Sequence, residues 1–239
     1  MKYKLLSILI PAYNEEKTII SVLDKVAKIK LPVKKELIII NNNSKDNTDK
    51  LVTEWIRKNK QISAKQTFEG KPGKGAAIRT GMAIAKGDLL LMQDADLEYD
   101  PRDYVVLLEP ILSEKTKVVY GNRLGFKENK KSYLSFYLGG RIMTLLFNII
   151  FCADIKDVNV CYKLWDAKLT KGIKFNEDGF VFDFVEITAL FLKKLKKEGL
   201  RVVNIPIHYY PRSIEEGKKI NWKDGLYGIY AMIKYRFFR

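Results

Sequence analysis

The chain has 239 residues, 47% of them hydrophobic and 30% charged, which favours one globular domain and excludes a disordered chain. Lysine and arginine outnumber aspartate and glutamate by 43 to 28, and the net charge of +15 favours an anionic partner: nucleic acid, a membrane surface or phosphorylated small molecules. Two cysteines and one histidine argue against a disulfide framework, a His-rich metal site and a His-based catalytic triad.

The first half of the chain alternates short apolar runs with helical patterns. Residues 5–10 are apolar without alternation, which indicates a strand buried on both faces and not a signal peptide. Further strands are predicted at residues 36–40, 89–92 and 118–121. Helices are predicted at residues 16–30, 51–56, 73–85 and 101–112. This alternation predicts a parallel α/β sheet with right-handed crossovers through residue 122.

Three polar clusters follow the predicted strands, at residues 11–15, 41–46 and 94–98. Ligands of such sheets bind at the carboxyl ends of the strands. We therefore expect the three clusters to converge on one crevice.

The second half is less regular. Helices are predicted at residues 131–151, 182–197 and 221–238, and strands at residues 158–165 and 200–208. No linker or repeat separates the halves, so we expect a shared core. The most apolar stretch has about 12 residues, whereas a spanning helix needs ~20, and no transmembrane segment is predicted.

Asp94 and Asp96 leave the strand at residues 89–92 two positions apart, so both carboxylates can face one hard cation, with Glu98 as a third ligand. The alternative is a capped turn with solvated acids. Lys74 follows Gly73 at a predicted helix start, which is a weak phosphate-binding signal. His208 is expected to be packed and hydrogen-bonded. Four more acids are expected to cap helices and face solvent: Glu177, Asp178, Asp183 and Glu186.

Several motifs in one order resemble the inverting glycosyltransferases of family 2, and within them the dolichyl- or polyprenyl-phosphate sugar transferases of the dolichol-phosphate mannosyltransferase type. The motifs are Ile10-Pro11-Ala12-Tyr13-Asn14-Glu15, residues 41–48, Gly73-Lys74-Gly75, residues 93–101, Tyr120-Gly121-Asn122-Arg123, Cys161-Tyr162-Lys163, Tyr209-Tyr210-Pro211-Arg212 and residues 216–220. The resemblance implies a GT-A nucleotide-diphospho-sugar transferase fold, with a mostly parallel sheet flanked by helices. It implies one catalytic domain over residues 1–239, with a nucleotide-binding half (1–122) and an acceptor-binding half (123–239).

The resemblance also implies the donor site. The nucleotide base and ribose are expected at Pro11, Ala12, Tyr13, Glu15, Ile39 and Asn41. Asp94, Asp96 and Glu98 are expected to bind Mg²⁺ or Mn²⁺, with Ala95 close to the diphosphate. The family usually has aspartate at positions 41 and 42, where this chain has asparagine. An amide both donates and accepts, which suits uracil, whose edge has a donor beside an acceptor, better than guanine, which presents two adjacent donors. The alternative is that both asparagines cap the turn.

Basic residues are expected to bind the phosphates. Arg123, Arg141 and Arg212 match positions that cradle the acceptor phosphate and the leaving diphosphate, and Lys218 lies in a loop that closes over the donor. Asp96, Arg123 and Arg212 are the expected catalytic residues.

The implied reaction is metal-dependent transfer of a hexose from GDP-mannose, UDP-glucose or UDP-N-acetylglucosamine to dolichyl or polyprenyl phosphate, with inversion to a β-linked product. The alternative is a family 2 enzyme with a saccharide acceptor in cell-surface glycan synthesis, although the Arg-Trp pair of processive synthases is missing. Nucleic acid is not an expected partner, because the polar clusters of the first half are acidic and amidic.

A lipid acceptor requires contact with a membrane. The predicted amphipathic helices at about residues 132–151 and 221–238 combine apolar and aromatic residues with cations, which is typical of interfacial helices. We expect a cytoplasmic protein that associates peripherally with the cytoplasmic face of a membrane. A separate membrane-anchoring subunit is the alternative.

Overall fold

The structure is a computed structural model that describes residues 2–130, 133–212 and 222–238. The sheet of these residues has seven strands in the order β3-β2-β1-β4-β6-β5-β7. The strands are β1 (Leu5–Ala12), β2 (Lys34–Asn41), β3 (Ala64–Phe68), β4 (Leu89–Met92), β5 (Val118–Asn122), β6 (Lys163–Asp166) and β7 (Val203–Pro206). The α-helices are α1 (Ile19–Lys28), α2 (Thr48–Lys58), α3 (Lys74–Ile84), α4 (Tyr104–Leu112), α5 (Leu134–Phe151), α6 (Ile187–Lys197) and α7 (Trp222–Phe237).

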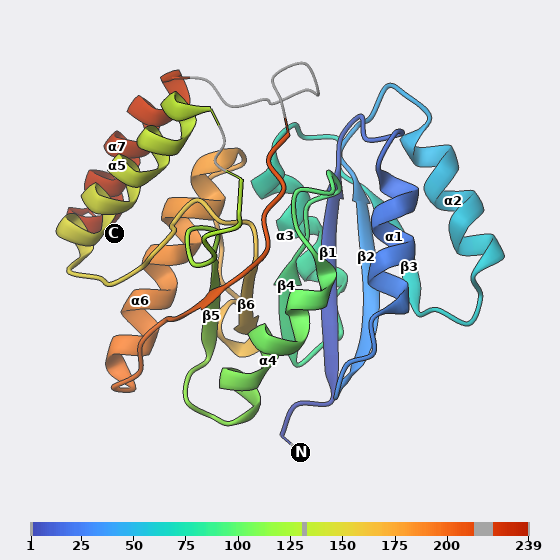
Figure 1. Ribbon diagram of the computed structural model, residues 1–239, viewed down its shortest axis with the longest axis horizontal. Helices are drawn as coiled ribbons and strands as arrows, with labels where there is room; N and C mark the ends of the chain where they lie inside the picture. The colour runs from blue at the N-terminus through green and yellow to red at the C-terminus, as the bar shows by residue number, and fades with distance from the viewer. Residues whose placement is uncertain (1, 131–132, 213–221, 239) are drawn as a thin grey trace.

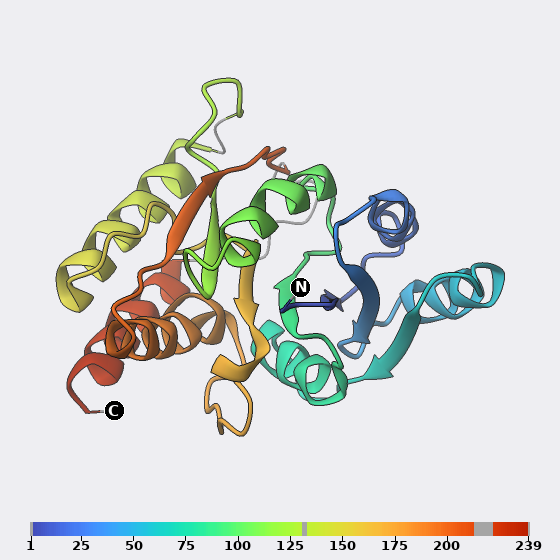
Figure 2. The same ribbon diagram turned by 90° about the horizontal axis from the view of Figure 1, so that it is seen from below.

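The centre of the sheet is the parallel array that the apolar runs predict. Ile8 of β1 pairs with Leu37 of β2 on one side and with Leu91 of β4 on the other. All three side chains are fully buried, because helices cover both faces of the sheet. Figure 2 shows α4 on one face and α3 with α6 on the other.

The strand β6 is the exception to the parallel arrangement, since it runs antiparallel to both β4 and β5. It is also shorter than the predicted strand at residues 158–165. Before Tyr162 the backbone bonds to side chains: Lys163 Nζ donates to the carbonyl of Val160, and the amide of Cys161 donates to the Tyr99 hydroxyl. The sheet is therefore mixed, although mostly parallel.

The edge strand β3 was not predicted from the sequence. Its residues, Ala64-Lys65-Gln66-Thr67-Phe68, are polar in part and only half-buried or exposed, because β3 pairs with β2 alone. An edge strand needs no continuous apolar run, so hydrophobicity does not reveal it.

The predicted strand at residues 200–208 is likewise reduced to β7. Pro206 has no amide hydrogen for the ladder, and the amide of His208 donates to Asp103 Oδ2 at 2.7 Å. The predicted helix at residues 182–197 begins with a π-helical segment, Phe182–Glu186, which continues into α6.

Buried side chains of the two halves belong to one hydrophobic cluster, which includes Leu9 of β1, Tyr120 of β5 and Phe191 of α6. The helices α5 and α7 lie side by side at one end of the molecule (Figure 1). Within the described parts of the chain, we find no helix that is both long and apolar enough to cross a membrane.

Candidate active site

The three polar clusters meet at the carboxyl edge of the sheet, as the strand arrangement predicts. The amide of Asn42 donates to the Ala12 carbonyl at 2.8 Å, which joins the loops after β1 and β2. The Thr18 hydroxyl donates to the Ala95 carbonyl at 2.7 Å, which joins the first loop to the one after β4. The convergence of the three clusters is therefore confirmed, and we call the place where they meet the crevice.

The loop after β1 presents an aromatic ring and a carboxylate. Asn14 turns the chain in a left-handed conformation, with φ of 54°, and its amide donates to Ser44 Oγ at 3.1 Å. The neighbouring Tyr13 is 45% exposed, so its ring can stack on a ligand. The amide of Glu15 is fixed by Thr48 Oγ1 at 2.9 Å. Pro11 is half-buried, whereas Ala12 is buried.

The expectation that Ile39 contacts the base is not supported by its position. Ile39 lies within β2 and is fully buried, so its side chain packs in the core and does not face the crevice. The hydrophobic run of a buried strand accounts for this residue without a ligand.

Both asparagines after β2 hold loops. Asn41 Oδ1 accepts from the amide of Ser44 at 3.0 Å, and its Nδ2 donates to Asp49 Oδ1 at 2.7 Å. Asn42 bonds to three backbone groups of the segment before α3: the carbonyls of residues 69 and 71 and the amide of residue 73. This geometry matches the turn-capping alternative, because both amide groups are engaged within the protein.

Arg212 ties the acidic residues of the crevice together. Its Nη2 pairs with Asp96 Oδ2 at 2.9 Å, its Nη1 pairs with Glu15 Oε2 at 3.2 Å, and its amide donates to Glu98 Oε1 at 2.9 Å. The Nε of Arg212 is buried and has no hydrogen-bond partner among the described residues. Burial, with the charges of Asp94 and Glu98, raises the pKa of Asp96 to about 7, although Arg212 opposes the shift.

The crevice has the oxygen chemistry that Mg²⁺ and Mn²⁺ prefer, but the three expected ligands do not form one set. Asp94 pairs with Lys74 at 2.8 Å, and Glu98 accepts from Arg212 and from the Tyr209 hydroxyl at 3.3 Å. Nowhere in residues 2–130, 133–212 and 222–238 do three or more His, Cys, Asp or Glu side chains form a metal-binding group. Asp94 and Asp96 fit a cation that completes its shell with phosphate and water, whereas both carboxylate oxygens of Glu98 accept hydrogen bonds, from Arg212 and Tyr209.

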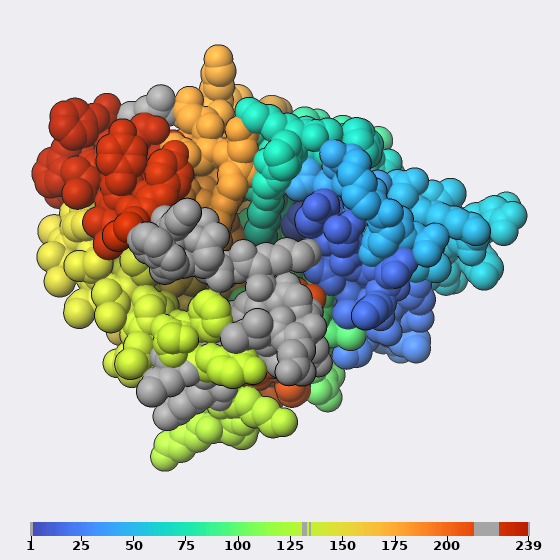
Figure 3. All heavy atoms as spheres, turned by 90° about the horizontal axis from the view of Figure 1, so that it is seen from above, coloured from blue at the N-terminus to red at the C-terminus, as the bar shows by residue number. Residues whose placement is uncertain are grey.

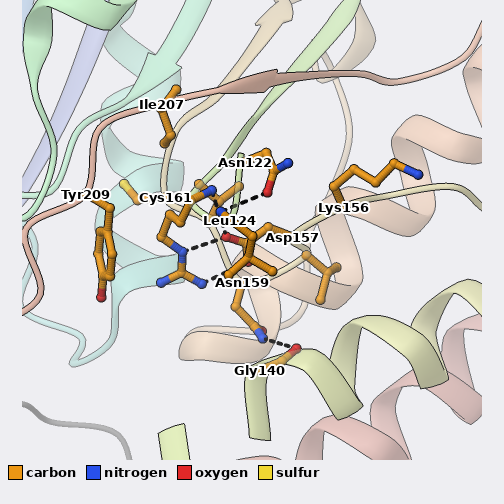
Figure 4. Close-up of polar contacts among 12 residues, drawn as sticks. Asn122, Leu124, Gly140, Lys156, Asp157, Asn159, Cys161, Ile207 and Tyr209 are labelled. Carbon is orange, nitrogen blue, oxygen red and sulfur yellow. Dashed lines mark hydrogen bonds and ion pairs between the residues drawn. The ribbon is translucent and has the colours of Figure 1, made fainter. Parts of the chain in front are cut away.

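Arg123 follows β5 and is fixed by a bidentate ion pair. Its Nε and Nη2 donate to the two carboxylate oxygens of Asp157 at 2.6 and 2.8 Å. Its guanidinium lies over the Tyr209 ring, 5.0 Å from the ring centre. Figure 4 shows Asp157 and Tyr209 here, with Asn159 directing its amide toward the Gly140 carbonyl at 3.5 Å. The guanidinium is thus oriented before any ligand binds.

The expected phosphate contact of Arg141 stays a prediction. Arg141 is exposed on α5, where its Nη1 donates to the Tyr137 hydroxyl at 3.2 Å, and it bonds to none of the crevice residues. Arg141 is exposed because one side of the apolar helix α5 faces solvent. Lys218 lies outside the described residues.

The structure adds a chain of four charges that sequence reasoning missed. Lys74 Nζ bridges Asp94 Oδ1 at 2.8 Å and Asp183 Oδ2 at 2.9 Å, and Lys163 Nζ pairs with Asp183 Oδ1 at 2.6 Å. We call these four residues the charge chain. Lys163 is fully buried, and burial lowers the pKa of this amine although Asp183 opposes the shift. The Cys161-Tyr162-Lys163 motif was the only signal for Lys163.

The remaining polar residues of the sequence analysis are His208, the acids of residues 177–186 and the start of α3. His208 is packed and hydrogen-bonded as expected, with its Nδ1 2.8 Å from Asp103 Oδ1. Glu177 and Glu186, like Asp183, are buried and not solvated. The start of α3 is not an open phosphate site, because the amide of Ala76 donates to the Asp178 carbonyl at 2.9 Å.

Comparisons with known proteins identify the family. The sequence profile of glycosyl transferase family 2 matches residues 7–199. A dolichyl-phosphate beta-glucosyltransferase of Trichomonas vaginalis is 31% identical over 182 residues, which cover 70% of this chain and 53% of that protein. A dolichol-phosphate mannosyltransferase of Pyrococcus furiosus is 25% identical over 215 residues, covering 89% and 58%. The chain thus spans little more than half the length of both relatives.

Among solved structures, glucosyl-3-phosphoglycerate synthase of Mycobacterium tuberculosis, in complex with Mn²⁺, UDP and glucosyl-3-phosphoglycerate, superposes with a TM-score of 0.69. The match covers 98% of this chain and 80% of that structure at 18% identity, so it shows the fold alone. The fold is GT-A, and the chain belongs to the family 2 glycosyltransferases.

Proposed function

We propose that this glycosyltransferase moves a hexose from a nucleotide sugar to dolichyl or polyprenyl phosphate in a metal-dependent, inverting reaction. The observation that carries the proposal is the convergence of Glu15, Asp94, Asp96 and Arg212 on one crevice. The Arg212 guanidinium, which suits phosphate, lies within hydrogen-bond distance of Glu15 and Asp96, and the charge of Asp94 lies close enough to Asp96 to raise its pKa. The names of the Trichomonas and Pyrococcus relatives support the lipid acceptor.

In this proposal the crevice residues have separate roles. Tyr13 stacks on the base, Glu15 accepts from ribose hydroxyls, and Asp94 and Asp96 hold Mg²⁺ or Mn²⁺. The divalent cation, when bound, would neutralise charge that develops on the leaving nucleoside diphosphate. Arg212 can turn its unpartnered Nε toward a phosphate oxygen. The nucleotide-binding half is residues 1–122.

The acceptor phosphate is proposed to bind in the half formed by residues 123–239, next to Arg123. The guanidinium is 21% exposed and already oriented by Asp157, so little conformational entropy is lost on binding. No general base is required, because a lipid phosphate is anionic near neutral pH. That agrees with the position of His208, the one histidine of the sequence, which is bonded to Asp103.

Two neighbouring helices are proposed to touch the membrane. Exposed apolar side chains recur at the same helical spacing on both: Leu138, Ile142, Leu145 and Ile149 on α5, and Leu226, Tyr230, Ile233 and Phe237 on α7. Figure 3 shows the yellow and red atoms of these two segments at one end of the molecule, away from the blue N-terminal residues. Apolar stripes with cations such as Arg141 and Arg236 suit the surface of an anionic bilayer, here the cytoplasmic face.

A donor panel tests the proposed reaction. Purified protein with Mn²⁺ or Mg²⁺ and a short polyprenyl phosphate would receive GDP-mannose, UDP-glucose or UDP-N-acetylglucosamine, each radiolabelled in the sugar. Parallel reactions would contain 3-phosphoglycerate or an oligosaccharide as the acceptor. The proposal expects lipid-linked label from one donor, with a uridine donor favoured by the UDP in the Mycobacterium structure. Transfer only to 3-phosphoglycerate or to the oligosaccharide would refute it.

Vesicle sedimentation tests the membrane surface. Ile142→Glu and Tyr230→Glu should each weaken binding to anionic phosphatidylglycerol vesicles several-fold. Val105→Glu is the matched control, because Val105 is 49% exposed on α4 and away from both stripes. Equal effects of all three variants would refute the assignment. Failure of the wild-type protein to bind such vesicles would favour a membrane-anchoring subunit.

A further inference from the structure

We propose that Lys74 is a donor-binding residue, which exchanges its ion pair with Asp94 for the diphosphate of the nucleotide sugar, and that Asp183 and Lys163 are positioning residues for it. This inference rests on the proposed function. It concerns the charge chain Lys163–Asp183–Lys74–Asp94, in which positive and negative groups alternate at 2.6, 2.9 and 2.8 Å.

The charge chain has a closed end and an open end. The side chains of Lys163 and Asp183 are 0% and 3% exposed, whereas those of Lys74 and Asp94 are 24% and 23% exposed. Solvent and ligands therefore reach the Lys74–Asp94 pair, while the other pair stays fixed in the interior. The Lys74 ammonium can therefore exchange Asp94 for a ligand while Lys163 and Asp183 stay buried and paired with each other.

Local structure holds the closed end, the Lys163–Asp183 pair, in a fixed position. Asp183 lies in the π-helical segment Phe182–Glu186, a type of distortion that often marks functional positions. Lys163 Nζ makes a further hydrogen bond to the Val160 carbonyl at 2.6 Å and lies 5.1 Å from the centre of the Tyr120 ring. Each polar atom of this buried pair is thus satisfied, as a fixed anchor requires.

The approach of Lys74 to Asp183 depends on glycine. Gly73 has φ of 120°, a conformation that side chains rarely adopt, and a Cβ on it would lie 2.3 Å from the Asp178 carbonyl oxygen. A Cβ on Gly75 would lie 2.5 Å from Cβ of Phe182. The start of α3 therefore packs directly against residues 178–182, and this contact carries Lys74 to the crevice.

A purely structural role explains the chain poorly. Burying the Lys163 ammonium and the Asp183 carboxylate is costly, and well-packed apolar residues often serve stability equally well. Strongly perturbed charged groups beside a crevice are typical of binding sites. Moreover, Asp94 is the carboxylate that we assign to the divalent cation, so Lys74 and that cation compete for one anion when no nucleotide is present.

This competition predicts opposite effects of one substitution. In Lys74→Met, Asp94 loses its competing ammonium, so Mn²⁺ alone should bind about fivefold more tightly. The same variant lacks the ammonium that meets the diphosphate, so UDP or GDP in the presence of saturating Mn²⁺ should bind about tenfold more weakly. Isothermal titration calorimetry measures both affinities without an acceptor.

Two further variants and a control complete the experiment. Lys74→Arg keeps a cation and should restore most of the nucleotide affinity. Asp183→Asn removes the anchor and should weaken nucleotide binding as Lys74→Met does. Lys71→Met is the control, because Lys71 lies in the same segment but pairs with Asp178 and not with Asp94. Its affinities should equal those of the wild type.

The outcomes separate the inference from the proposed function. If Lys74→Met weakens Mn²⁺ and nucleotide binding together, or changes neither, the inference is wrong even if Asp183→Asn fails to fold. Failure of the wild-type protein to bind UDP and GDP with Mn²⁺ would overturn both. If the opposite effects appear but no lipid-linked sugar forms in the donor panel, only the proposed acceptor fails.

Discussion

Glu177 fastens α7, the helix that carries one proposed membrane stripe, to the rest of the protein. One of its carboxylate oxygens accepts from the Tyr227 hydroxyl at 2.8 Å, and the other accepts from Lys234 Nζ at 3.1 Å and the Tyr235 hydroxyl at 3.2 Å. Tyr235 also donates to Glu186 at 2.7 Å. Loss of the Glu177 charge should therefore loosen α7.

The substitution Glu177→Gln replaces three charge-assisted hydrogen bonds with neutral ones. At about 0.7 kcal/mol for each bond, the free energy of unfolding should fall by about 2 kcal/mol at pH 7. For a chain of this size, that corresponds to a fall of about 4–8 °C in the melting temperature. The control Glu114→Gln removes an exposed ion pair with Lys2 and should leave the melting temperature unchanged.

The same variant predicts a pH dependence. Burial would raise the pKa of Glu177, but hydrogen bonds from Tyr227 and Lys234 outweigh burial and hold this pKa below its usual value. The carboxylate therefore stabilises the fold at pH values above the ordinary glutamate pKa, and this contribution is lost as the pH falls through the lower pKa of the folded state.

Thermal unfolding followed by circular dichroism, at a series of pH values, measures both effects. The difference in melting temperature between the wild type and Glu177→Gln should be largest near pH 7 and should vanish in acid. Binding of Glu177→Gln to anionic vesicles should also weaken, because α7 presents its stripe less firmly. A difference that is independent of pH, or no larger than that of Glu114→Gln, would refute the reasoning.

Three shorter predictions concern the crevice. Asp96→Asn should lower turnover at least about 100-fold, with an unchanged melting temperature, since it removes a proposed metal ligand; full activity would contradict the assignment. Asp157→Asn should lower the free energy of unfolding by about 2 kcal/mol in urea titrations, because the half-buried Arg123 guanidinium loses its bidentate partner. Asn41→Asp should lower the free energy of unfolding by about 1–2 kcal/mol, because two carboxylates would then face each other at positions 41 and 49. Adding Asp49→Asn should restore the stability. A donor panel with this double variant tests whether the residue at position 41 recognises the nucleotide base.

The central sheet and the crevice follow from the sequence because local patterns determine them. Uninterrupted apolar runs such as residues 5–10 specify buried parallel strands, and parallel strands bring their carboxyl ends together. The polar loops that end at Glu15 and begin at Asp94 therefore had to meet. His208 is hydrogen-bonded, as expected, although its partner Asp103 lies far away in the sequence and could not be named from it.

What the sequence did not reveal depends on contacts between distant segments. The partners Lys74, Asp183 and Lys163 lie on α3, the π-helical segment and β6, so no local pattern joins them. The antiparallel direction of β6 is likewise a property of the assembled sheet. The exposure of Arg141 is another such property, because an apolar helix sequence does not show that one of its sides faces solvent.

The central claim is that the crevice transfers a hexose to a lipid phosphate with inversion. Its most direct test is the product of a reaction between the wild-type protein, Mn²⁺, the accepted α-linked donor and a short polyprenyl phosphate, analysed by proton and phosphorus NMR. We expect one phosphodiester that links the lipid to a β-configured sugar. An α-configured phosphodiester, or a sugar attached to any hydroxyl acceptor in place of the phosphate, would contradict it.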